Sequence, residues 1–239
     1  MTDAIQLTHS SGDGAEIRTF GAELLSWRAR EVDMIWAKNP KVWDQTAPVL
    51  FPVVGWTRDG RVRVDGEIYP LALHGFAWKK RFDVAERRDD YLRLALVDDA
   101  ETRALYPFAF RFEVEFQLRA GALENNLIVT NADSRPLPYA CGLHPAFRWP
   151  LAGSSSSHAI IFERAERAEV PIIGPGGLFS DPIRKTPLVG RRLPLEPEMF
   201  TRDALCFLNL ASHSLVFDNG EGARLSVTLN DFQIGRPHV

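Results

Sequence analysis

The sequence predicts an all-β fold, a large antiparallel sandwich, from three observations. Phe110 to Leu118 (FRFEVEFQL) alternates strictly between apolar and polar residues, which is the period-two pattern of a strand with one buried face. Shorter runs rich in β-branched, aromatic or leucine residues recur along the chain, separated by Gly, Asp, Asn or Pro. Helical patterns do not recur between these runs, so a parallel βαβ architecture is not expected.

The other expected strands share this composition. They are AEIRTF (15–20), RVRVDGEIYPL (61–71), YLRLALV (91–97), NNLIVTN (125–131), SLVFDN (214–219) and ARLSVTL (223–229). The Asp-Gly pair inside the second of these runs predicts a β-hairpin, because both residues tolerate the positive φ of a tight turn.

Helix and loop signals are few. One short helix is expected within 98–107, with Asp98 as its N-cap and Glu101 completing a capping box. Two segments, 151–159 (LAGSSSSHA) and 171–182 (PIIGPGGLFSDP), are predicted to be exposed loops. The GPGG stretch in the second is interpreted as a turn, because no strand and helix flank it as a phosphate-binding loop requires. Neither loop is long enough for a linker, so we expect a single domain over residues 1–239.

Composition excludes several classes of function. The 239 residues are 45% hydrophobic and carry a formal net charge of −3, so no basic field attracts nucleic acid or an acidic membrane surface. No apolar run approaches the roughly 20 residues that span a bilayer, and the start of the sequence shows no secretory signal. Cys141 and Cys206 belong to no CxxC pair. We expect two buried free thiols and a cytoplasmic protein.

Two of the six histidines are candidates for chemistry. His74 precedes Gly75, which allows a sharp turn that would leave the imidazole at a pocket rim. His144 precedes a proline, which pushes it into an extended conformation and fixes its direction; Phe147 and Trp149 follow it and offer faces on which a sugar ring can stack. The structural alternative for each is a histidine that caps a strand end or fills a core. Two separated histidines without a third partner are a poor zinc signature, so no metal is expected.

Five segments resemble, in order, those of the aldose 1-epimerases (mutarotases), in particular the galactose-mutarotase-like branch. Together they cover most of the chain from about Ala15 to Leu229. The segments are FGAELLSW (20–27), APVLFPVVGWTRDGRVRVDGEIYPLALHGFAW (47–78), TRALYPFAFRFEVEFQL (102–118), NNLIVTNADSRPLPYACGLHPAFRWP (125–150) and MFTRDALCF (199–207).

The resemblance implies a large antiparallel β-supersandwich that interconverts the α and β anomers of a free aldose. It implies that His144 is the general acid, that His74 is a second active-site histidine, and that Asp203 helps to hold the sugar hydroxyls. A sugar is then the expected small-molecule partner, and no metal, nucleotide or other cofactor is expected. Histidine suits the acid role because a pKa near ~6.5 lets it donate and recover a proton at neutral pH.

This chain departs from the family pattern near the expected pocket. Members of this branch often carry arginine where this chain has Trp56 or Trp78. An arginine grips hydroxyls or a phosphate bidentately, whereas tryptophan stacks or donates one hydrogen bond. We expect Arg58 to substitute, and the departure disfavours a sugar phosphate as substrate.

The second departure concerns the general base. The family's base is a glutamate on one of the last strands, beyond the segment matched by ARLSVTLNDFQIG (223–235), and no glutamate follows Glu221. The resemblance therefore predicts that C-terminal strands and the base are missing. Three alternatives stay open: a shortened enzyme, a recruited carboxylate, or a non-catalytic carbohydrate-binding sandwich that holds sugar with Trp56, Phe147 and Asp203. Missing strands leave an unpaired sheet edge, which we expect to pair in a homo-oligomer or to be covered by the chain's own tail.

Overall fold

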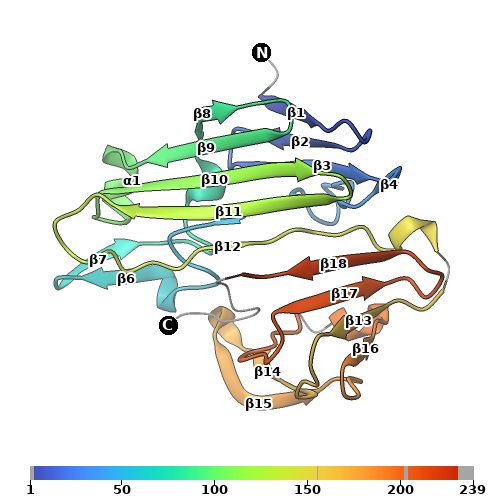
Figure 1. The fold of residues 1–239 in the computed structure, drawn as a ribbon. Helices are drawn as coiled ribbons and strands as arrows, with labels where there is room; N and C mark the ends of the chain where they lie inside the picture. Colours follow the sequence, from blue (N-terminus) through green and yellow to red (C-terminus); the bar gives the residue numbers. More distant parts are fainter. Residues whose placement is uncertain (1–2, 155, 202–203, 231–239) are drawn as a thin grey trace. The chain divides into compact units, whose positions relative to one another are not determined.

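The computed structural model describes residues 3–154, 156–201 and 204–230. They form two compact units, residues 1–148 and 149–239, and each is described here by itself. Strands dominate both units, so the predicted all-β fold is confirmed (Figure 1). The expected single domain stays a prediction. None of the described helices is long and apolar enough to cross a membrane.

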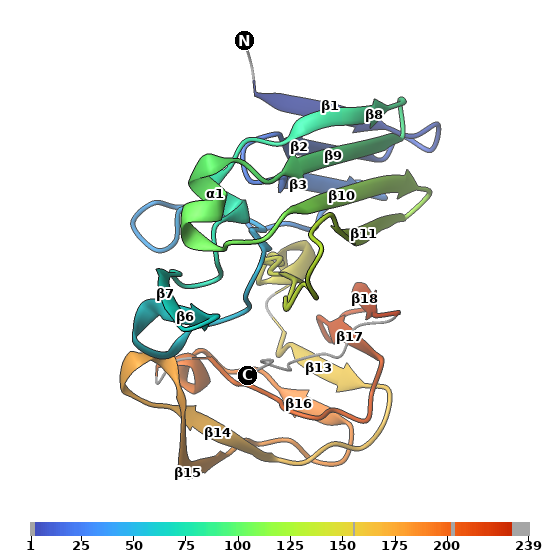
Figure 2. The same cartoon turned by 90° about the vertical axis from the view of Figure 1, so that its left-hand side faces the viewer.

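Two four-stranded antiparallel sheets build the first unit, in the orders β1-β2-β3-β4 and β11-β10-β9-β8. Figures 1 and 2 show them lying face to face. The first sheet consists of β1 (Ala4–Thr8), β2 (Gly14–Arg18), β3 (Glu23–Ala29) and β4 (Val32–Asp33). The second consists of β8 (Asp83–Arg87), β9 (Tyr91–Val97), β10 (Phe110–Arg119) and β11 (Ala122–Asn131).

Strand β10 confirms the clearest sequence pattern. Its alternate residues Phe110, Phe112, Val114, Phe116 and Leu118 are each at most 1% exposed. Burying a side chain of this size contributes about 1.5–3 kcal/mol relative to leaving it exposed. The charged residues between them point to the other face, so one strand supplies a large part of the apolar layer between the sheets.

Short elements precede, interrupt and follow the second sheet. They are β5 (Val49–Leu50), η1 (Arg58–Gly60), β6 (Arg61–Val64), β7 (Glu67–Pro70), η2 (Ala77–Lys79), α1 (Ala100–Leu105) and β12 (Gly142–Leu143). The predicted Asp-Gly hairpin is confirmed, because β6 pairs with β7 around Asp65 and Gly66, whose φ values are 50° and 89°. β5 pairs with β12 across a long stretch of sequence.

The short helix is confirmed but its cap is one residue later than expected. Asp99, not Asp98, is the N-cap, and its carboxylate accepts a hydrogen bond from the Thr102 N–H at 2.6 Å. The Thr102 hydroxyl accepts the reciprocal bond from the Asp99 N–H, the role expected of Glu101. Asp98 is committed elsewhere, because its carboxylate accepts from the Phe110 N–H at 2.9 Å and so ties the helix to the start of β10.

The second unit contains a four-stranded antiparallel sheet in the order β16-β13-β17-β18 and a separate hairpin of β14 and β15. Its small core is built around Phe162, Leu188 and Leu193. The elements are η3 (Leu151–Gly153), β13 (Ala159–Phe162), β14 (Glu169–Ile173), η4 (Pro175–Gly177), β15 (Phe179–Lys185), β16 (Arg192–Pro194), η5 (Pro197–Phe200), β17 (Ser214–Asp218) and β18 (Arg224–Thr228).

The prediction of an exposed loop over 171–182 is wrong. β14 and β15 pair in this region, and only the Gly-Pro-Gly-Gly stretch between them is the turn that was expected. The apolar residues of this segment alternate too little for a period-two signal, so its glycines and prolines dominated the sequence pattern. Segment 151–159 begins with the single turn η3 and ends where β13 starts.

Candidate active site

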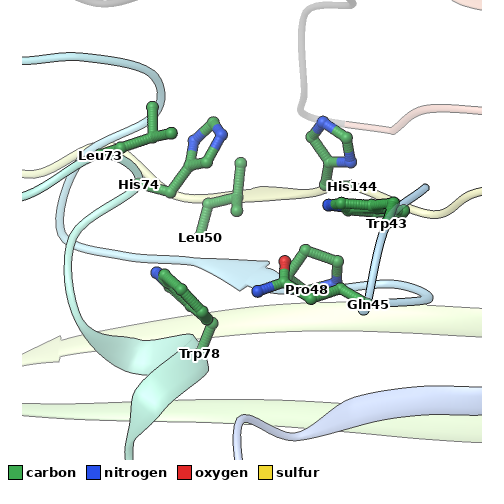
Figure 3. Close-up of a pocket in the computed structure, with 8 residues that line it drawn as sticks. All are labelled: Trp43, Gln45, Pro48, Leu50, Leu73, His74, Trp78 and His144. Atoms are coloured by element: carbon green, nitrogen blue, oxygen red, sulfur yellow. The ribbon is translucent and has the colours of Figure 1, made fainter. Parts of the chain in front are cut away.

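A cavity of about 200 Å³ lies in the first unit, where the segments before and after β5 meet β12 and the loop before η2 (Figure 3). It contains both predicted catalytic histidines. Its lining residues are Trp43, Gln45, Pro48, Leu50, Leu73, His74, Trp78 and His144. None of them is an aspartate, glutamate, lysine or arginine, so the described wall contains no carboxylate, ammonium or guanidinium group.

Pairing between β5 and β12 brings His144 to this cavity. Leu143 lies opposite Val49 and Gly142 lies opposite Leu50. The next N–H along, that of His144, donates to the Pro48 carbonyl at 3.2 Å. The imidazole therefore follows directly from a paired strand, and Pro145 restricts the backbone at the exit. The His144 residue is exposed.

His74 is held by a strained turn against the core. It has φ of +61°, and Gly75 follows with φ of +72°. A side chain on Gly75 would lie only 2.6 Å from the carbonyl carbon of Phe51, so this position requires glycine. The Phe51 carbonyl also accepts hydrogen bonds from the N–H groups of Phe76 at 3.0 Å and Ala77 at 3.2 Å.

The protonation state of His74 follows from its contacts. Its ring Nδ1 accepts a hydrogen bond from the Gly55 N–H at 3.0 Å, while the backbone N–H of His74 donates to the Gly55 carbonyl at 2.9 Å. Burial lowers the pKa of His74 to about 4, and the nearby His144 adds to the shift. The ring is therefore neutral at pH 7, and because Nδ1 is an acceptor, its remaining proton is on Nε2.

The two imidazoles lie close together although 74 and 144 are far apart in the sequence. Their ring centroids are 5.7 Å apart, and Figure 3 shows them on either side of Leu50. The Trp43 ring centroid is 5.4 Å from that of His144. Trp43 thus lies against the more exposed histidine, and both imidazoles line the same cavity.

Three of the remaining predicted site residues do not line this cavity. Trp56 is 50% exposed, Arg58 is exposed, and Phe147 is part of a bridge with Ile35. None of these three lines the cavity. Asp203 lies outside the described residues, and the sugar-binding roles of all four stay predictions.

Six lining residues had not been singled out as binding residues, and three of these are aromatic or polar, namely Trp43, Gln45 and Trp78. Trp78 had been noted only as a departure from the family pattern. Its indole N–H is buried without a partner among the described residues, and Lys79 Nζ lies 4.2 Å from its ring centroid. The indole N–H is therefore not exposed to the cavity, and Trp78 contributes only the carbon atoms of its side chain to the wall. A tryptophan among the charged and polar residues of KVWDQ (41–45) was the available signal for Trp43.

Metal binding finds little support in this geometry. Within the part of the chain that the structure describes, no group of three His, Cys, Asp or Glu side chains is placed to hold an ion. His74 Nδ1 is already occupied by the Gly55 N–H, which leaves His144 and one nitrogen of His74. Two such donors do not make the four-coordinate site that zinc prefers.

The sandwich, with two imidazoles at a small aromatic-lined cavity, defines a galactose mutarotase-like protein. The model of the family described as aldose 1-epimerase matches residues 3–173. The chain belongs to the aldose 1-epimerase family, and the resemblance seen in the sequence is confirmed.

Individual relatives agree with this placement. Protein LacX (plasmid form) from Lactococcus lactis subsp. lactis is 26% identical over 229 residues, covering 91% of this chain and 77% of LacX. A galactose mutarotase-like protein from Lactobacillus casei ATCC 334 superposes with a TM-score of 0.85 at 27% identity, covering 96% of this chain and 80% of that one. A galactose mutarotase related enzyme from Lactobacillus acidophilus has a TM-score of 0.74 at 24% identity, covers 90% of this chain and 69% of its own, and supports the fold alone.

Proposed function

We propose that this protein is an aldose 1-epimerase-like isomerase that interconverts the α and β anomers of a free hexose by general acid/base catalysis. The observation that carries the proposal is the pair of imidazoles on one cavity, with ring centroids 5.7 Å apart, in a chain of the aldose 1-epimerase family. The cavity of about 200 Å³ is smaller than the ~300–1,000 Å³ typical of drug-sized ligands, which suits a single sugar ring.

In this proposal His144 is the acid. It donates a proton to the ring oxygen as the bond from C1 to that oxygen breaks, while a base removes the proton from the C1 hydroxyl. The products are the open-chain aldehyde and its new C5 hydroxyl. After rotation about the C1–C2 bond, that hydroxyl attacks the other face of C1 and gives its proton back to His144. The protonated base returns its proton to the former aldehyde oxygen, which becomes the C1 hydroxyl again. No hydrogen bond to a described residue engages the His144 ring, so it is available for this exchange.

His74 has a different role because it is neutral. Its Nε2–H is a fixed donor, since the Gly55 N–H holds Nδ1 as an acceptor. A neutral donor can stabilise the negative charge that develops on a sugar oxygen without competing for the proton that His144 transfers. In this proposal His74 donates a hydrogen bond, whereas His144 donates a proton.

One observation favours a second candidate function. No carboxylate lines the cavity among the described residues, and the step at the C1 hydroxyl needs a base. A carbohydrate-binding protein that holds the closed sugar ring without opening it requires only the neutral cavity. Catalysis and binding are therefore tested separately.

Polarimetry of freshly dissolved α-galactose and α-glucose tests the enzyme proposal. We expect the protein to accelerate the decay of optical rotation, and His144→Asn to lower kcat by about 10²-fold or more, because a positioned acid contributes ~10²–10⁴-fold. His213→Asn is the matched control, since His213 is exposed in the second unit and outside the cavity lining. A rate equal to that of buffer, with sugar binding detected by calorimetry, would establish the binder instead.

The cellular location of the protein and its assembly are also proposals. Cys141 is a free thiol and is only partly buried, not fully buried as expected. Burial raises its pKa to about 11, so this thiol is protonated and unreactive at neutral pH. The free thiol of Cys141 supports the expected reducing cytoplasm. Assembly through a sheet edge stays a prediction that size-exclusion chromatography tests.

A further inference from the structure

Gln45 is a polar residue of the cavity wall that has no role in the proposed chemistry. Its carboxamide makes no hydrogen bond with a described residue, although it carries two donors and one acceptor. Figure 3 shows the amide between Pro48 and Trp78, on the same cavity as the two imidazoles. Among the described residues that line the cavity, Gln45 carries the one side-chain carboxamide.

The backbone next to Gln45 is fixed by buried hydrogen bonds. The Thr46 N–H donates to Glu23 Oε1 at 2.7 Å, and the Thr46 hydroxyl donates to the Leu24 carbonyl at 2.6 Å. The Thr46 carbonyl accepts from the Ala146 N–H at 2.8 Å, on the segment that carries His144. Glu23 is only 3% exposed and is ion-paired with Arg18. The position of Gln45 relative to His144 is therefore set before any ligand binds.

We propose that Gln45 is a specificity-determining residue whose carboxamide binds hydroxyl groups of a neutral, unphosphorylated sugar, away from the reacting C1 and ring oxygen. The inference rests on the proposed function and names its substrate class. A hydroxyl both donates and accepts, and a carboxamide can match both roles, through its N–H groups and its carbonyl oxygen, without adding charge. A cavity wall built to bind a hydroxyl also discriminates against an analogue that lacks it, because its own polar group is then left unpaired.

The substitution Gln45→Met tests this directly, because methionine keeps the length of the side chain and removes its hydrogen bonds. Gln6→Met is the matched control, since Gln6 is exposed on β1 and outside the cavity lining. Both variants and the wild type are titrated calorimetrically with galactose, its 2-, 3-, 4- and 6-deoxy analogues, and galactose 6-phosphate. Polarimetry supplies KM and kcat for α-galactose.

We expect Gln45→Met to raise Kd and KM for galactose about 3- to 10-fold, the effect of one or two hydrogen bonds, with kcat within about twofold of wild type. At least one deoxy analogue should bind wild type and Gln45→Met equally, which identifies the contacted hydroxyl. Gln6→Met should match wild type, and galactose 6-phosphate should bind more weakly than galactose.

Three results overturn the inference: an unchanged Kd in Gln45→Met, the same loss for every deoxy analogue, or tighter binding of the phosphate ester. Wild type that binds galactose without accelerating mutarotation refutes the enzyme proposal alone, and the Kd values then still decide the role of Gln45. Wild type that binds no hexose refutes both.

Discussion

At the scale of single residues, His74 gives the protein a defined response to pH. Its folded-state pKa of about 4 lies below the ordinary value of 6.5, because burial penalises the charged ring and His144 lies nearby. As the pH falls below 6.5 the unfolded chain binds a proton at this position and the folded chain does not. The free energy of unfolding therefore decreases between pH 6.5 and 4.

We expect this group to remove about 1 kcal/mol of stability between pH 7.5 and pH 5, a value reduced for the partial exposure of the ring. Urea unfolding at the two pH values measures it. His74→Asn should show a smaller difference, because asparagine does not titrate and tolerates positive φ. An NMR titration that places the pKa of His74 near 6.5 would contradict the prediction.

At the scale of elements, the turn before η2 depends on Gly75. A Cβ at this position would clash with the backbone of Phe51. A residue with a side chain would also be strained at this position, because φ is +72°. We expect Gly75→Ala to lower the free energy of unfolding by about 2–4 kcal/mol, from backbone strain and a clash that has no flexible partner to move.

Gly12→Ala separates the two contributions. Gly12 also has positive φ, +89°, but nothing lies within 4 Å of an added Cβ. It should lose only about 1 kcal/mol, the cost of the left-handed backbone alone. Thermal or urea unfolding measures both variants, and equal losses would show that the contact between residues 51 and 75 is not a constraint.

The elements also show what the sequence could predict. The alternation in Phe110 to Leu118 and the Asp65-Gly66 turn are local signals, and both were correct. The helix cap was displaced by one residue because the Asp98 carboxylate binds the start of β10, a contact that no local pattern reveals. The hairpin of β14 and β15 was missed because proline and glycine masked its strands.

For the site, too, the sequence pattern does not reveal contacts between residues that are distant in the sequence. Resemblance to a family and the His-Gly and His-Pro pairs pointed to His74 and His144, which the structure places together. Trp43 and Gln45 reach the same cavity only because β5 pairs with β12, and that pairing is non-local. Trp56 is the same residue type as Trp43, yet it is 50% exposed and does not line the cavity. Residue type alone could not separate them.

At the scale of the whole molecule, Phe51 couples the apolar core of the first unit to its cavity. Its ring stacks on Phe112 at 4.5 Å with an interplanar angle of 15°, and it is completely buried. Its carbonyl binds the turn that follows His74. Phe51→Ala should cost about 3–5 kcal/mol in the free energy of unfolding, as for other large-to-small changes in a core.

The same variant should also weaken sugar binding, although Phe51 does not line the cavity. Phe20→Ala is the control, because Phe20 is 36% exposed and its loss should cost less than about 1 kcal/mol. Chemical denaturation and calorimetric titration measure the two effects. Full stability in Phe51→Ala would show that the ring stack is dispensable.

The contact between residues 51 and 75 has a practical meaning for protein engineering. Combinatorial libraries intended to admit a bulkier carbohydrate gain nothing by randomising Gly75, because the chain has no space there for any side chain. Leu73, which is partly exposed on the rim, can be shortened without disturbing that backbone contact. Variation should therefore begin at Leu73 and leave the glycine untouched.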